Sequence, residues 1–179
     1  MDYLKILREP PDLAEKFDAL FDFFLLDELS PRDDAEGRCT FSLPGMAFAR
    51  DGSGGEYHLL EDGSIGYYRS EGEAGRLAES MDAFFSLLVS CICWHDCCDA
   101  KQYVDSKTLE EYGQRQRNTN LEDMDSLRRV SDALGIPTGE PLAPVLERFR
   151  KATQREPVYQ CIFHEDDGSL TESYGLMFE

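Results

Sequence analysis

The sequence has no long apolar run. Its longest uncharged, mainly apolar tract extends from Phe84 to Trp94, well short of the ~18 residues that suggest a membrane span. The amino-terminal stretch MDYLKILREPPDL mixes acids and bases and lacks an apolar segment followed by small residues, which is the pattern of a secretory signal. We therefore expect a cytoplasmic protein whose thiols are reduced and form no disulfides.

Basic residues are scarce. The chain has 18 lysines and arginines against 36 aspartates and glutamates, which gives a formal net charge of -18 at pH 7. Residues 1–100 carry 21 acids and 8 bases, residues 101–157 carry ten of each, and the tail from Val158 carries five acids and no base. Such a surface repels nucleic acid and anionic lipid and attracts basic proteins. We expect a basic protein partner, no nucleic acid and no membrane, although solubility alone would also explain the charge.

Disorder and repeats are also excluded. Apolar residues make up 41% of the 179 residues and aromatic residues 11%, enough to build the core of one globular domain. The turns EDGS and DDGS look alike, but the stretches around them do not match. Their similarity indicates shared turn chemistry and no internal repeat.

Four stretches have the periodicity of amphipathic helices. They are residues 12–29, a segment from Leu77 into the cysteine-rich stretch, residues 108–134 with a break near Asn118, and residues 142–154. We expect the second of these helices to cover a sheet.

Short runs rich in aromatic and aliphatic residues predict strands. The runs EYHLL and IGYYRS flank an Asp-Gly turn and predict a β-hairpin, in which Tyr57 shares a face with Leu59 and Ile65 shares one with Tyr67. CTFSL and MAFA predict strands before this hairpin, the glycine-rich EGEAG is interpreted as a link, and VYQCIF and SYGLMF predict a terminal hairpin. The expected fold class is α+β, an antiparallel sheet with helices packed on it.

The glycine-rich loop at residues 51–55 fails two tests for a binding loop. A phosphate-binding loop needs a Lys-Ser/Thr pair and a following helix, whereas Glu56 and a predicted strand follow here. The calcium loop of an EF-hand could begin with Asp51 and Ser53, but it requires glycine where Glu56 stands. The loop is interpreted as a turn.

No pattern in the sequence points to catalysis. None of the three histidines has a local catalytic arrangement with Ser or Asp, and adjacent acids at turn tips are solvated. A calcium site at Asp33, Asp34 and Glu36 stays open as an alternative to a solvated loop. We expect no enzyme activity, no cofactor and no metal.

Four of the six cysteines lie between Cys91 and Cys98. On a continuous helix, Cys91, His95 and Cys98 would fall on one face and could hold zinc. Structural zinc sites usually draw on two separated cysteine pairs, and the chain has one such segment. The segment is interpreted as part of the core together with Trp94, and metal binding and thiol chemistry are the alternatives.

The block from Phe48 to Trp94 resembles the SUKH superfamily of bacterial toxin-immunity proteins, which also includes a fungal cell-wall-assembly regulator. In that family a strand ending near "FA" leads through a Gly-rich turn and a hairpin to a helix that ends near a tryptophan. The matching positions are Phe48, Ala49, Gly52 to Gly55, Tyr57, Leu59, Gly63, Ala78, Ser80, Phe84 and Trp94. The resemblance implies a single SUKH-like domain over residues 1–179, with its core at 46–95, a helical extension at about 105–155 and a terminal hairpin at 157–178.

The resemblance also implies a function. Immunity proteins of this superfamily bind and neutralise a cognate toxin, which is often a nuclease. A toxin that binds nucleic acid carries a basic cleft, and an acidic inhibitor could cover that cleft. We expect contact residues among acids and tyrosines around the hairpin, namely Asp51, Glu56, Glu61, Asp62, Tyr67, Tyr68, Glu71 and Glu73. A regulatory scaffold without catalytic activity, or a metal- or thiol-dependent enzyme using Cys91 to Cys98, are the alternatives.

Overall fold

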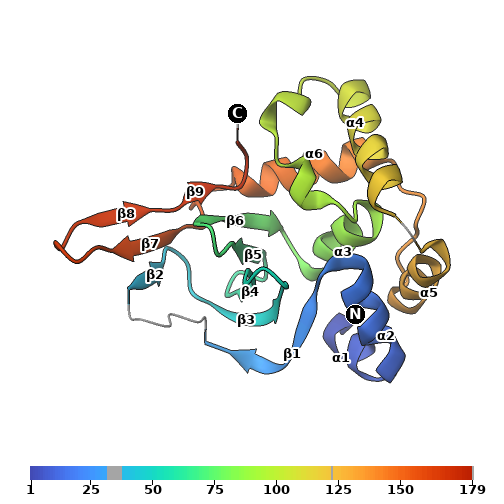
Figure 1. Cartoon of the computed structure of the whole chain (residues 1–179), viewed down its shortest axis with the longest axis horizontal. Helices are drawn as coiled ribbons and strands as arrows, with labels where there is room; N and C mark the ends of the chain where they lie inside the picture. The colour runs from blue at the N-terminus through green and yellow to red at the C-terminus, as the bar shows by residue number, and fades with distance from the viewer. Residues whose placement is uncertain (32–37, 122, 179) are drawn as a thin grey trace.

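A six-stranded sheet in the order β1-β3-β4-β5-β6-β9 forms the middle of the molecule (Figure 1). The computed structural model describes residues 1–31, 38–121 and 123–178. The strands of this sheet are β1 (Phe24–Ser30), β3 (Gly45–Arg50), β4 (Glu56–Leu60), β5 (Ile65–Tyr68), β6 (Glu73–Ala78) and β9 (Tyr174–Gly175). All neighbours are antiparallel except β6 and β9, which are parallel. The α+β fold class is confirmed.

Helices cover one face of this sheet. They are α1 (Tyr3–Arg8), α2 (Pro11–Phe21), α3 (Met81–Ser90), α4 (Ser106–Asn120), α5 (Met124–Leu134) and α6 (Leu142–Thr153), with 3₁₀ helices η1 (Trp94–Cys97) and η2 (Ala100–Gln102). α3 and α6 pack on β6, α4 packs on α6, and α2 packs on α5. Figure 1 shows the helices gathered to one side of the strands.

The core lies between the sheet and α3. Tyr57 and Phe84 are fully buried with ring centroids 5.6 Å apart, and Phe84 also packs against Phe85 and Phe23. Tyr57 pairs with Tyr67 across β4 and β5, and Leu59 pairs with Ile65. The predicted hairpin and its buried face are therefore confirmed, and the pairing shows its register.

A small second sheet, in the order β2-β7-β8, covers the opposite face of the hairpin. Its strands are β2 (Cys39–Phe41), β7 (Cys161–His164) and β8 (Leu170–Glu172). Phe41 and Phe163 from this sheet contact Tyr68 of β5. In Figure 1 the β7–β8 hairpin extends away from the helices.

The structure corrects the helix predicted over residues 12–29. α2 ends at Phe21, because Asp22 adopts a left-handed conformation with φ 49° and ψ 56°. Phe24 and Leu25 then pair with β3 as strand β1. The apolar spacing suited a helix, but pairing at the edge of the sheet outweighs such a local preference.

The structure also corrects the link predicted at residues 71–75. Glu73 begins β6, and the helix predicted from Leu77 begins at Met81. Gly75 lies inside β6 because the strand passes close to Leu176: a Cβ at Gly75 would lie 3.0 Å from that side chain. Glycine in this strand thus marks a close approach of two segments.

Most of the remaining predicted elements are present with small shifts. The break near Asn118 separates α4 from α5, residues 142–154 form α6, CTFSL contains β2, and MAFA lies within β3. The terminal hairpin is corrected: its strands are β7 and β8, and SYGLMF is not the second strand, because Tyr174–Gly175 pairs in parallel with β6 instead. Asp33, Asp34 and Glu36, the alternative calcium site, lie outside the described residues.

Candidate functional site

The cysteine-rich segment forms a buried loop after α3. The helix ends at Ser90, where Cys91 leaves the helical region with φ -129° and ψ 82°. Cys91, Cys93 and Cys97 are at most 6% exposed. The Sγ atom of Cys91 lies 3.6 Å from that of Cys97 and 3.9 Å from that of Cys93, and all three sulfurs lie within 4.8 Å of one another. We call these three residues the thiol cluster.

This loop corrects the expectation that Cys91, His95 and Cys98 share one helical face. Because the α-helix stops before Cys91 and η1 is a 3₁₀ helix, the 3.6-residue spacing does not apply. The Cys98 thiol points instead to the carbonyl of Trp94, at 3.8 Å. Trp94 is 1% exposed, which confirms its place in the core.

Side chains from α4 and from the turn before it hold the loop in shape. Tyr103, Tyr112 and Arg117 donate hydrogen bonds to backbone carbonyls within residues 90–97, at 2.9 Å for Tyr103 and 3.3 Å for Arg117. These contacts come from outside the loop. The sulfurs of the thiol cluster are therefore held together by the surrounding fold.

The three thiols do not share one protonation behaviour. Hydrogen bonds from Cys91 and then Cys97 hold the pKa of Cys93 well below its ordinary value, and the charge of Arg117 lowers it further. The hydrogen bonds to Cys93 and Cys97, together with burial, raise the pKa of Cys91. The arrangement thus shifts the pKa values of Cys93 and Cys91 in opposite directions.

A second buried network joins the 51–55 turn to the thiol loop. Asp51 accepts hydrogen bonds from the backbone N–H of Gly55 at 2.7 Å and from the Tyr67 hydroxyl at 2.5 Å. His95 Nε2 lies 3.3 Å from the same hydroxyl. Burial raises the pKa of Asp51, but the hydrogen bonds from Tyr67, Ser53 and Gly55 outweigh it and lower the pKa. Burial lowers the pKa of His95 to about 4.

The carboxylate, phenol and imidazole of this network have no room for a substrate. The cavity beside Tyr67 and His95 has a volume of about 20 Å³, whereas ligand pockets usually measure roughly 300–1,000 Å³. The space is close to that of one water molecule. The Asp51–Tyr67–His95 network therefore holds the turn and the loop together.

Comparison with protein-family models, with curated proteins and with solved structures found no match. Across the described residues, no helix combines the length and the apolar character needed to cross a bilayer. The functional interpretation consequently depends on the chain's own geometry.

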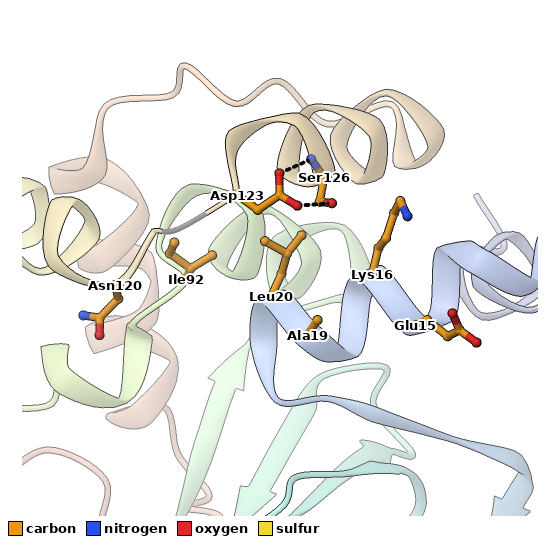
Figure 2. Close-up of a pocket in the computed structure, with 8 residues that line it drawn as sticks. All are labelled: Glu15, Lys16, Ala19, Leu20, Ile92, Asn120, Asp123 and Ser126. Atoms are coloured by element: carbon orange, nitrogen blue, oxygen red, sulfur yellow. Dashed lines mark hydrogen bonds between the residues drawn. The ribbon is translucent and has the colours of Figure 1, made fainter.

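A cleft of about 390 Å³ lies between α2, the start of α5 and Ile92 (Figure 2). Asp123 on its wall caps α5, accepting from the backbone N–H of Ser126 at 2.9 Å and from its hydroxyl at 2.6 Å. Lys16 lies 3.9 Å from Asp12. Figure 2 shows Ile92, which separates Cys91 from Cys93 in the sequence, on the wall of this cleft. The lining polar groups serve helix capping and a surface ion pair, and form no nucleophile–base pair.

Three of the predicted contact residues are buried. Asp51 and Tyr67 belong to the network above. Glu56 accepts from the Arg50 guanidinium at 2.9 Å and lies 3.0 Å from Nε2 of His58. These side chains offer a partner little surface and stabilise the sheet from both faces.

The other predicted contact residues lie at opposite ends of the hairpin. Glu61 and Asp62 lie at the β4–β5 turn, where Asp62 is 3.3 Å from the buried Arg76. Glu71 and Glu73 lie at the β5–β6 turn, where both pair with Arg69. Tyr68, on β5, packs against the small sheet. The eight residues therefore do not form one surface.

Sequence reasoning missed a group of exposed residues in the C-terminal segment. Leu170 is 63% exposed and Tyr174 is 77% exposed. Tyr174 pairs with Glu73, and its N–H donates to the carbonyl of Gly72 at 3.1 Å. This places the acidic β5–β6 turn beside the acidic tail. The tail's lack of bases was visible in the sequence, but its parallel pairing with β6 was not.

Proposed function

We propose that this protein binds a basic protein partner through a surface that we call the tail surface, and that it neutralises a toxin in this way. The tail surface consists of Glu71, Glu73, Leu170, Glu172 and Tyr174. It joins two of the predicted contact acids to the C-terminal segment through the pairing of β6 with β9. The remaining predicted acids have structural partners or lie at the other end of the hairpin.

The exposure of Tyr174 is the observation that carries this proposal. The residue lies in a strand, where its backbone is fixed by pairing with β6, yet its side chain is 77% exposed. Tyrosine is enriched among the residues that contribute most to protein interfaces, because it offers a large contact area and loses little conformational entropy on binding. A rigidly mounted, exposed tyrosine is suited to be an anchor.

Charge supports a basic partner. Glu172 is exposed, and the tail from Val158 carries five acids and no base. Arg69 lies 3.9 Å from Glu71 and 3.6 Å from Glu73 and offsets part of that charge. With a net charge of -18 the whole chain attracts basic proteins, and the tail surface is the place where such a partner would bind.

The test uses the protein encoded beside this gene. Binding kinetics between the two purified proteins should show an association rate that falls as ionic strength rises. Tyr174→Ser should weaken binding by at least about 30-fold, the effect of losing a hot spot of about 2 kcal/mol. Co-expression with wild type should protect cells from the neighbouring protein, and co-expression with Tyr174→Ser should protect them less.

A charge reversal distinguishes the contribution of the tail surface to association from that of the net charge of the chain. Glu172→Lys should slow association, whereas Glu111→Lys, which makes the same change on α4, should leave it nearly unaltered. Equal slowing by both variants would reject the tail surface. A neighbouring protein that is harmless and does not bind would reject neutralisation, and a growth defect on deletion without any toxin would favour the regulatory scaffold.

A further inference from the structure

The thiol cluster is the one group of three or more metal-ligand side chains that lies close together among residues 1–31, 38–121 and 123–178. We propose that Cys91, Cys93 and Cys97 form a three-thiolate site for a soft d¹⁰ metal ion, with Cu⁺ as the ion whose three-coordinate geometry they match.

The sulfur separations have the size that a shared ion requires. Three sulfurs in a plane at ~2.3 Å from a central metal lie about 4.0 Å apart, and in a tetrahedron they lie about 3.8 Å apart. The separations from Cys91 are 3.6 Å and 3.9 Å, and the sulfurs of Cys93 and Cys97 lie within 4.8 Å of each other. An ion can therefore enter with small movements of the side chains.

The other cysteines behave differently. The thiol of Cys98 points to a backbone carbonyl at 3.8 Å, and Cys161 lies in the separate core beneath the small sheet. Both are buried, as the thiol cluster is. Simple packing of cysteine as a small hydrophobe does not require three sulfurs to converge, and only the loop at 91–97 brings them together.

The number and the chemical type of the ligand atoms determine which metal ion the site prefers. Thiolates select soft ions such as Cu⁺ and Zn²⁺ over Mg²⁺ or Ca²⁺. Zinc in structural sites takes four ligands, and the described residues supply three in this cluster. The cluster offers Cu⁺ three donors of the soft sulfur type that this ion prefers.

The loop is preorganised for such a site. Tyr103, Tyr112 and Arg117 fix its carbonyls from outside, as the outer hydrogen-bond partners of metal sites do. Ile92 separates two of the ligands in the sequence and lines the cleft of Figure 2, so that cleft lies next to the loop.

The test is a titration of the reduced, metal-free full chain with Cu⁺ supplied by a competing chromophoric chelator, and in a second arm with Zn²⁺. Wild type should bind one Cu⁺, develop a thiolate-to-metal charge-transfer band and gain thermal stability. Cys93→Ser and Cys97→Ser should each weaken binding by more than about 100-fold, the upper end of what losing an outer partner costs. Cys98→Ser and Cys161→Ser are the matched controls and should bind as wild type.

Folding of each variant is checked by circular dichroism without metal. Alkylation with mass spectrometry gives an independent readout, since the ion should protect three thiols in wild type. No binding by the folded wild type, or equal binding by Cys97→Ser, overturns the site. Tighter binding of Zn²⁺ than of Cu⁺ keeps the site and overturns the choice of ion.

Discussion

Buried polar residues do more structural work in this protein than its acidic composition suggests. Arg76 is 1% exposed and donates to the carbonyls of Arg155 and Pro157, at 2.8 Å and 2.6 Å, and to Ser64 at 3.1 Å. It thereby ties the segment after α6 to β6. Replacing this arginine is costly, because it would leave the carbonyls of Arg155 and Pro157 without the donor that they share.

Asp51 allows a pH test at the scale of one residue. Its pKa is lowered from 3.8 in the folded protein, so its stabilisation is fully present above the unfolded pKa and is lost as the pH falls through the folded pKa. Asp51→Asn should reduce the free energy of unfolding by about 2 kcal/mol at pH 7. Denaturant titrations should show this difference closing below pH 3.8.

Asp167 provides the control for that measurement. It accepts from the backbone N–H of Ser169 at 2.9 Å in a similar turn, but it is exposed. Asp167→Asn should change stability little at any pH, because solvent replaces the lost contact. A difference between wild type and Asp51→Asn that persists unchanged at pH 2 would contradict the assigned role of the carboxylate.

At the scale of elements, sequence patterns identified the parts that depend on local interactions. The β4–β5 hairpin was predictable because an Asp-Gly turn, in which Gly63 has φ 81°, separates two short runs rich in aromatic and aliphatic residues. The ends of α2 and α3 were not predictable, because Phe24 pairs with a strand from elsewhere and the carbonyl of Ser90 is held by Arg117 of α4. The thiol cluster forms only because α3 ends at Ser90.

Gly75 tests the contact between β6 and the C-terminal segment. Gly75→Ala places a methyl group 3.0 Å from Leu176 and should reduce the free energy of unfolding by about 1 kcal/mol, the low end for overpacking. Hydrogen exchange should increase at residues 174–178. Gly139→Ala is the control, since a Cβ there meets nothing within 4 Å; equal effects of both changes would show that the contact is unimportant.

At the scale of the molecule, the sequence predicted how the charge is distributed along the chain, but it did not predict which acids lie together on an accessible surface. The predicted acids lie on both faces and both ends of one hairpin, so composition alone could not say which of them are accessible. The pairing of Glu73 with Tyr174 brings together residues from opposite halves of the chain. Such a parallel contact leaves no local pattern to find.

The net charge of -18 also predicts how salt affects stability. Repulsion among the excess acids destabilises the compact state, and salt screens it. The thermal midpoint should therefore rise between 20 mM and about 300 mM NaCl, while association with a basic partner slows over the same range. A midpoint that falls with salt would mean that surface ion pairs outweigh the repulsion.

The parallel pairing of β6 with β9 has a consequence for folding. β6 forms an edge of its sheet until the segment from Tyr174 arrives, and that segment is synthesised long after β6. Contacts so distant in the sequence form late, and an uncovered strand edge can pair with another chain in the meantime. Completion of the sheet during translation thus waits for Tyr174, a residue of the tail surface, and aggregation of nascent chains is the hazard that this topology creates.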